Sequence, residues 1–203
     1  MLNRKIRIAV FVSGGGTNLQ ALIDAQNSGI IKSGEIVLVV SNKEGAYALE
    51  RAKNNGIKSV TVARKNFATV DDFENELLKV LEENNIDFIV FAGFLAILSD
   101  RVTSKYPNRI INIHPSLIPA FCGKGYYGLK VHESALEYGV KVTGATVHYV
   151  NEVTDGGKII AQKAVEIKEG DTPEILQKRV MEEAEWVLLP KATEDVCKKL
   201  LEE

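Results

Sequence analysis

The sequence predicts a single-domain α/β fold in which a mostly parallel twisted sheet carries helices on both faces and ends in a mixed C-terminal strand portion. Three observations predict it. Short β-rich segments alternate with helical patterns through the first half of the chain, and most of these β segments are apolar throughout. Strands of this kind, separated by helices, form the parallel sheet of a Rossmann-like fold. The 203 residues, 45% of them hydrophobic, suffice for one sizeable core, so we expect residues 1–203 to form one domain.

Five apolar segments in the first half are typical of buried strands. They are rich in Ile, Val and Phe, the residues that pack well in sheets. We expect strands at residues 6–13, 36–41, 59–63, 88–92 and 109–113. Because apolar residues fill most of these segments, both faces of the sheet should be covered by helices.

Three helices are expected between these strands, at residues 17–29, 46–56 and 69–85. Gly29 and Gly56 close the first two, because glycine readily takes the left-handed conformation that ends a helix. Thr69 can cap the third helix at its amino end. The apolar residues of that helix share one face, as an amphipathic helix requires: Phe73, Leu77, Val80 and Leu81.

The second half of the chain changes character. Residues 139–150 and 156–167 read as two strands joined by the turn-rich sequence NEVTDGG, which favours a mixed sheet at this end. A helical region starts at Pro173, and we expect Pro190 to interrupt it because proline has no N–H to donate. No internal repeat, low-complexity tract or linker divides the chain.

Composition excludes several classes of protein. The formal net charge of −2 gives no electrostatic basis for binding nucleic acid or an anionic membrane. No apolar run reaches the roughly 20 residues of a transmembrane helix, and Arg7 interrupts the apolar start, so we expect no signal peptide. Cys122 and Cys197 are too few for a disulfide framework. We therefore expect a cytoplasmic protein.

The first predicted strand leads into SGGGTNLQ, residues 13–20. The glycines allow a tight turn, and the amides of the following helix would point at a bound anion. Leu19 stands where a dinucleotide fingerprint has its third glycine, and the second strand ends in VVSNK without an acid for a ribose diol. The loop therefore favours a phosphate monoester over NAD; the alternative is a tight turn that binds nothing.

Asn112 and His114 lie two residues apart where the fifth strand is predicted to end. This spacing puts both side chains on one face of an extended segment, and Pro115 keeps His114 extended. Ligands of such sheets bind beyond the carboxyl ends of the strands. Asp155 starts an Asp-Gly-Gly run, which is typical of a plain turn. The alternative is that this run returns to the crevice, where the carboxylate of Asp155 would raise the pKa of His114.

The chain has three histidines, His114, His132 and His148. Their spacings match no familiar metal-binding pattern, so we expect no metal site, although a zinc site that uses all three is an alternative. His148 shares its strand face with Thr146, which favours a structural role for it.

Seven segments occur in the order found in the 10-formyltetrahydrofolate transferase and hydrolase family: FVSGGGTNLQ, VSNK, FAGFLAILS, INIHPSLIP, GATVHYV, DGGKIIAQ and GDTPEIL. The chain resembles the members of this family that act on glycinamide ribonucleotide. The resemblance implies that Asn112, His114 and Asp155 are the catalytic trio. It also implies that the substrate contacts are Gly15, Gly16, Thr17, Asn18 and Glu185. The folate contacts that it implies are Phe94, Leu95, Ala96, Ile97, Leu98, Val150 and Thr154.

Three features qualify the resemblance. Placing Glu185 at the family's ribose contact needs one extra residue between Asp171 and Pro190. Ala96 stands where the family often has an arginine, which removes a cation that could bind the glutamate tail of the folate. The link between Pro119 and His132 is longer than usual and should reshape the wall near the substrate.

The implied activity is transfer of a formyl group from 10-formyltetrahydrofolate, a co-substrate, to the primary amine of glycinamide ribonucleotide in de novo purine biosynthesis. No metal is implied, and the expected state is a monomer or homodimer with these small molecules as partners. One alternative is the deformylase of the family, which transfers the group to water and has an extra N-terminal domain for which we expect no room here. The other is a non-catalytic module that binds a phosphorylated metabolite.

Overall fold

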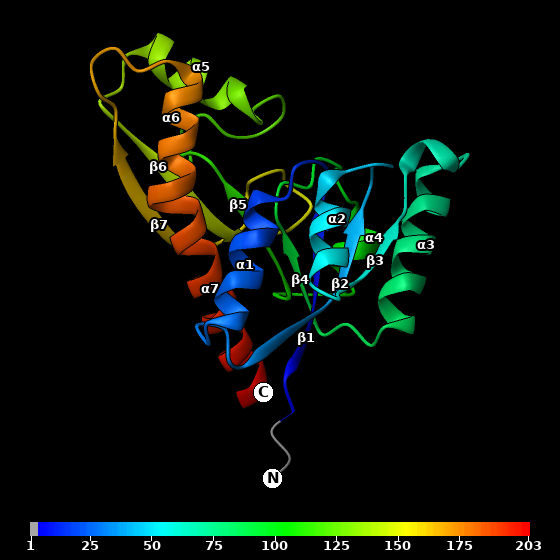
Figure 1. Ribbon diagram of the computed structural model, residues 1–203. Helices are drawn as coiled ribbons and strands as arrows, with labels where there is room; N and C mark the ends of the chain where they lie inside the picture. The colour runs from blue at the N-terminus through cyan, green and yellow to red at the C-terminus, as the bar shows by residue number, and fades with distance from the viewer. Residues whose placement is uncertain (1–3) are drawn as a thin grey trace.

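The computed structural model describes residues 4–203 and is built around one seven-stranded sheet (Figure 1). The strands are β1 (Ile6–Val12), β2 (Gly34–Ser41), β3 (Lys58–Thr61), β4 (Phe88–Phe91), β5 (Ile110–His114), β6 (Val142–Tyr149) and β7 (Ile159–Glu166). Their order is β3-β2-β1-β4-β5-β6-β7. The pairings from β3 to β5 are parallel, and β6 and β7 join antiparallel. The predicted fold class is confirmed, and a single domain over residues 1–203 stays a prediction.

The direction of the strand order reverses at β1. The chain runs outward from β1 to β2 and β3, and then returns to place β4 on the other side of β1. Such a reversal opens a crevice between the loops at the carboxyl ends of the two central strands. The sequence after β1 begins the glycine loop, and the sequence after β4 begins the segment expected to bind folate.

Helices cover both faces of the sheet. Those packed on one face are α1 (Thr17–Asn27), α2 (Tyr47–Asn54), α6 (Pro173–Val180) and α7 (Trp186–Glu202). Those packed on the other face are α3 (Val70–Glu83) and the single-turn α4 (Asp100–Thr103). A short 3-10 turn, η1 (Arg64–Asn66), precedes α3, and α5 (Leu129–Tyr138) packs beside α6 at one end of the molecule (Figure 1). Within residues 4–203, no helix is long and apolar enough to cross a membrane.

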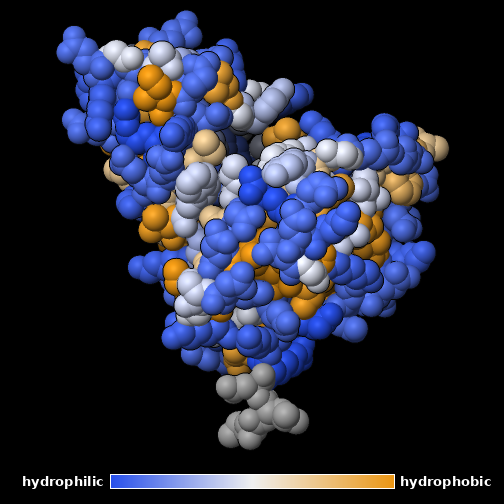
Figure 2. Space-filling model, viewed as in Figure 1, coloured by the Kyte–Doolittle hydropathy of each residue, from blue (hydrophilic) through white to orange (hydrophobic). Residues whose placement is uncertain are grey.

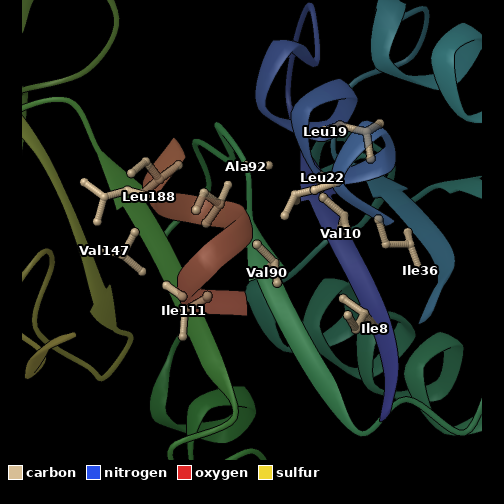
Figure 3. Close-up of a cluster of buried hydrophobic side chains, with 14 of the residues drawn as sticks. Ile8, Val10, Leu19, Leu22, Ile36, Val90, Ala92, Ile111, Val147 and Leu188 are labelled. Carbon is tan, nitrogen blue, oxygen red and sulfur yellow. The ribbon is translucent and has the colours of Figure 1, made fainter. Parts of the chain in front are cut away.

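The two faces of β1 contribute to separate hydrophobic cores, as the alternation of a strand requires. Ile8 and Val10 point into the core under α1, where Figure 3 shows Val10 near Leu22. Ala9 and Phe11 point into the opposite core. All five side chains are fully buried, and burial of each larger apolar one stabilises the fold by about 1.5–3 kcal/mol. These cores fix the carboxyl ends of the strands, where the site lies.

Two local predictions had different outcomes. The Thr69 hydroxyl accepts a hydrogen bond from the amide of Asp72 at 3.1 Å, so the predicted cap is confirmed. The interruption at Pro190 is wrong, because this proline lies inside α7. The irregularity comes earlier, in the π-helical turn η2 (Met181–Glu185), and Trp186 after it has a ψ of −11°. A proline ring clashes with the carbonyl four residues before it, which here belongs to Trp186. The chain therefore departs from α-helical geometry at Trp186 and not at Pro190.

No helix is predicted from the sequence at α5, whose first turn belongs to the longer link between Pro119 and His132. Its sequence LKVHESALEY buries Val131, His132 and Ala135 on one side. Gly139 ends the helix with a φ of 82°, the left-handed conformation that glycine adopts without strain. In the sequence, Gly139 was the available signal for the end of this helix.

Candidate active site

A cavity of about 440 Å³ lies at the carboxyl ends of the central strands. Figure 2 shows the surface hollowed between the lobe that carries α5 and the rest of the molecule. Segments far apart in the sequence line the cavity: residues 91–98, 112–115, 123–128 and 148–155, together with Asn18, His132, Gln177, Met181 and Glu185. The cavity therefore lies where the strand order predicts a ligand.

The three residues expected to catalyse converge at one wall of this cavity. Asn112 and His114 project from β5, which extends one residue beyond the predicted end. Asp155 returns to them from the β6–β7 connection, with Oδ2 3.6 Å from Nδ1 of His114. Its other oxygen, Oδ1, lies 3.5 Å from Nε2 of His148. The Asp-Gly-Gly segment is thus a loop that reaches the crevice, and the catalytic roles themselves stay predictions.

The surroundings of His114 determine which ring nitrogen can exchange a proton. Nε2 lies 2.9 Å from the carbonyl oxygen of Phe121, so this nitrogen carries the hydrogen and donates it. Nδ1 is left to take up or release a proton beside Asp155. Burial lowers the pKa of His114, and the charge of Asp155 raises it by less, so the pKa falls below its ordinary value of 6.5. The expectation that Asp155 raises the pKa of His114 is confirmed for the contribution of Asp155 itself, and burial outweighs that contribution.

Asp155 itself is held in the ionised form. Burial would raise the pKa of its carboxyl, but contacts with His148 and His114 and the amide of Gly123 lower it by more. That amide donates to Oδ2 at 2.8 Å. A carboxylate fixed in this way keeps its charge next to Nδ1 of His114 at neutral pH.

His148 orients the amide of Asn112. The two residues are directly opposite in the β5–β6 pairing. Nδ1 of His148 lies 2.8 Å from the carbonyl oxygen of Tyr149 and donates to it, which turns Nε2 toward Nδ2 of Asn112 at 3.2 Å and toward Oδ1 of Asp155. The second N–H of that amide is then free to face a ligand. His148 therefore positions a site residue, which the sequence could not reveal because the strand register was unknown.

The glycine loop forms the amino end of α1. Gly16 has a φ of 71°, and a Cβ added there would lie 2.6 Å from Cβ of Ala48, so this position requires glycine. Nε of Arg51 donates to the carbonyl of Gly15 at 2.8 Å and holds the loop. No side chain caps α1, which leaves the amides of its first turn available to an anion.

Thr17 and Asn18 follow the loop and occupy different places. Asn18 lines the main cavity, whereas Thr17 lines a second groove beside it. Gly15 and Gly16 line neither of the two. Nδ2 of Asn18 donates to Oε2 of Glu185 at 2.6 Å, which brings the predicted ribose contact to the start of α1.

The turn η2 accounts for the position of Glu185. A π-helical turn has i→i+5 hydrogen bonds and holds one more residue than an α-helical turn. The extra residue that the family resemblance requires between Asp171 and Pro190 is therefore taken up by this five-residue turn. Burial raises the pKa of Glu185, and the hydrogen bond from Asn18 offsets part of this rise.

We expect Glu185→Gln to stabilise the protein above pH 5. Glu185 keeps its proton to a higher pH in the folded state than in the unfolded state. The free energy of unfolding therefore falls as pH rises from about 4.5 to the folded pKa. Glutamine carries no charge, so the variant should lack this fall. Its free energy of unfolding at pH 8 should exceed that of the wild type by roughly 1 kcal/mol. Urea unfolding at pH 4 and pH 8 measures the difference, and equal gains at both values would contradict it.

The segment expected to bind the pterin forms an apolar wall. All residues from Phe94 to Leu98 line the cavity. Leu95 and Ile97 are 49% and 64% exposed, unusually high values for such side chains. A flat ring system bound against them would remove this apolar surface from water.

The backbone of this wall is held at both ends. The hydroxyl of Ser13, at the end of β1, accepts a hydrogen bond from the amide of Leu95 at 2.8 Å. Glu74 of α3 is fully buried and accepts from the amide of Ser99 at 2.6 Å. Main-chain groups between these two points are thus fixed in place for a ligand.

Val150 and Thr154, the remaining predicted folate contacts, also line the cavity. Sequence reasoning missed several lining residues, half of them on or next to the longer link: Lys124, Tyr126, Tyr127, His132, Asn151, Val153, Gln177 and Met181. Lys124 is the only lysine or arginine lining the cavity in the described part of the chain. Among residues 4–203, no cluster of three or more His, Cys, Asp or Glu side chains could hold a metal ion.

Comparison with known proteins identifies the chain's relatives. A family model described as formyl transferase matches residues 6–193. A chloroplastic phosphoribosylglycinamide formyltransferase of Arabidopsis thaliana is 42% identical over 181 residues, which are 89% of this chain and 62% of the relative. The trifunctional purine biosynthetic protein adenosine-3 of Gallus gallus is 44% identical over 193 residues, 95% of this chain and 18% of the relative. The chain thus spans less than two thirds of these curated relatives.

Solved structures agree along nearly their whole length. A glycinamide ribonucleotide transformylase 1 from Symbiobacterium toebii superposes with a TM-score of 0.90 at 38% identity, covering 98% of this chain and 90% of that one. A phosphoribosylglycinamide formyltransferase from Bacillus halodurans gives a TM-score of 0.88 at 39% identity, with 96% of each chain covered.

Proposed function

We propose, since this chain belongs to the formyl transferase family, that it transfers a formyl group from 10-formyltetrahydrofolate to the primary amine of glycinamide ribonucleotide, a step of purine biosynthesis. The observation that carries the proposal is the convergence of Asn112, His114 and Asp155 on one cavity. That cavity has an apolar wall on one side and the start of α1 on the other.

The reaction is acyl transfer between two amines. The substrate nitrogen forms a bond to the formyl carbon, and the electron pair of the C=O bond moves to oxygen. The tetrahedral intermediate collapses when the bond from this carbon to N10 of the folate breaks. The attacking amine loses one proton and N10 gains one, so protons balance. The site must therefore stabilise an oxyanion and move a proton, without a protein nucleophile.

The side chains on the cavity wall suit these two tasks. Asn112, whose amide is oriented by His148, has a second N–H for the oxyanion. His114 protonated at Nδ1 donates to the same oxygen and can pass this proton to N10, and the proton lost by the amine restores it. Asp155 stabilises the charged ring across 3.6 Å. The lowered pKa of His114 makes its proton easy to release.

The two ends of the cavity suit the two substrates. We assign the phosphate of glycinamide ribonucleotide to the amides at the start of α1, and its ribose to Glu185. The pterin would lie against Leu95 and Ile97, under the loop that carries Thr154. With Ala96 in place of a cation, Lys124 is the charged residue available for an anionic part of either substrate.

Formyl transfer measured with the purified protein tests the proposal. Absorbance of the released folate should rise only when glycinamide ribonucleotide is present, and the formylated product should appear in equal amount. Formate release that is independent of this substrate would instead indicate the deformylase. Binding of the ribonucleotide without folate binding, measured by calorimetry, would indicate a non-catalytic module.

Thr17→Asp should raise the KM for glycinamide ribonucleotide about tenfold or more. The new carboxylate would repel the substrate phosphate, and two charges roughly 4 Å apart repel by about 1 kcal/mol in water and more near a protein surface. Steady-state kinetics measures the change, with Thr17→Asn as the uncharged match. An acid in the first turn of a helix does not destabilise it, so stability should hold. An unchanged KM would place the phosphate elsewhere.

Four further properties stay predictions. We expect residues 1–203 to act as one catalytic domain, in the cytoplasm, without a metal ion. The expected oligomeric state is a monomer or homodimer, which light scattering of the purified protein measures.

A further inference from the structure

His132 is a buried polar side chain that the mechanism above leaves unused. It lies on α5, is 1% exposed, and lines the same cavity as Asn112 and His114. Neither of its ring nitrogens has a hydrogen-bond partner among the described residues. Buried polar groups almost always have a partner, so this ring calls for one from outside the protein.

The neighbours of His132 on α5 show that its polarity is not required by packing. Val131 and Ala135 bury apolar side chains on the same side of the helix. An apolar residue of similar size would fill the position of His132 without leaving unpaired nitrogens. Because its ring faces the cavity, the missing partner is a molecule bound there.

The ring of His132 differs in charge from that of His114. Burial, together with the positive charge of His114, lowers the pKa of His132 to about 4. Asp155 pairs with His114 and His148 and leaves His132 without a carboxylate partner. At neutral pH His132 is therefore neutral, with one N–H and one lone pair.

We propose that His132 accepts a hydrogen bond from the primary amine of the substrate and so directs the nitrogen lone pair at the formyl carbon. This inference rests on the proposed function. An unprotonated amine has two N–H groups and one lone pair, so fixing one N–H against a rigid acceptor sets the direction of the lone pair. Orientation of this kind is a large part of the rate in reactions between two bound molecules. An imidazolium could not serve, because it has no lone pair to accept with.

His132→Leu tests the proposal, because leucine has a similar size and no acceptor. We expect kcat/KM for glycinamide ribonucleotide to fall about 10- to 100-fold, while the Kd of a folate analogue stays within twofold. His132→Gln keeps an acceptor oxygen and should recover part of the loss. Glu133→Ala, at the exposed neighbouring position on α5, is the matched control and should behave as the wild type.

Nuclear magnetic resonance of ¹⁵N-labelled histidines gives a second readout in the wild-type protein. Adding glycinamide ribonucleotide should shift the signal of the unprotonated ring nitrogen of His132, as a new hydrogen bond does. An unmoved signal, or a His132→Leu variant with kcat/KM within twofold of wild type, would overturn the proposal. The proposed function fails differently, since the wild-type protein itself would then show no formyl transfer.

Discussion

His114→Ala is expected to lower kcat for formyl transfer about 100- to 1000-fold while the fold survives. The ring supplies the hydrogen-bond donor for the oxyanion, and loss of one such donor typically costs this much. His114 ends β5 and borders the cavity, so removing its ring enlarges the cavity instead of emptying a packed core. Absorbance of the released folate gives kcat, and thermal unfolding checks the fold.

Asp155→Asn is the companion variant, and it separates the charge of Asp155 from its size. The negative charge of Asp155 raises the pKa of His114 against the larger effect of burial, so its removal should lower that pKa further. A proton titration of the His114 ring should therefore have its midpoint below 6.5 in the wild type and lower still in the variant. Near-normal turnover in both His114→Ala and Asp155→Asn would show that the catalytic assignment is wrong.

Gly157→Ala should lower kcat/KM at least about 100-fold and destabilise the protein by roughly 1–3 kcal/mol. A Cβ at Gly157 would clash with the carbonyl oxygen of Tyr149. That oxygen belongs to the backbone of β6, where the amide of Tyr149 donates a hydrogen bond to the carbonyl of Lys158. The strand pairing therefore holds the carbonyl of Tyr149 in place. The loop must shift instead, and Asp155, two residues away, moves from His114 with it.

Gly45→Ala is the control for this variant. Gly45 has a φ of 70° and open space around it, so alanine there costs only the strain of a left-handed conformation. It lies outside the cavity lining, and its variant should lose roughly 1 kcal/mol of stability and no activity. If Gly157→Ala behaved in the same way, the close approach to Tyr149 would not be what positions Asp155.

Much of the fold was predictable because apolar periodicity is a local property of the sequence. The alternation of apolar segments and amphipathic helices gave β1 to β5 and α1 to α3 within a few residues. The longer link hid α5, because its glycines resemble a loop. Pro190 was misplaced as a break, since the sequence does not show that the turn η2 before it can absorb the irregularity.

The sequence by itself determined the α/β class, the glycine turn before α1, and the common face of Asn112 and His114, because each depends on neighbouring residues only. Tertiary structure alone decided that Asp155 reaches His114, that His148 pairs with Asn112 across two antiparallel strands, and that His132 faces the cavity. Burial, which also exists only in the folded chain, outweighs the effect of Asp155 on the pKa of His114. Contacts between distant segments and exclusion of water arise from packing, and no local pattern encodes them.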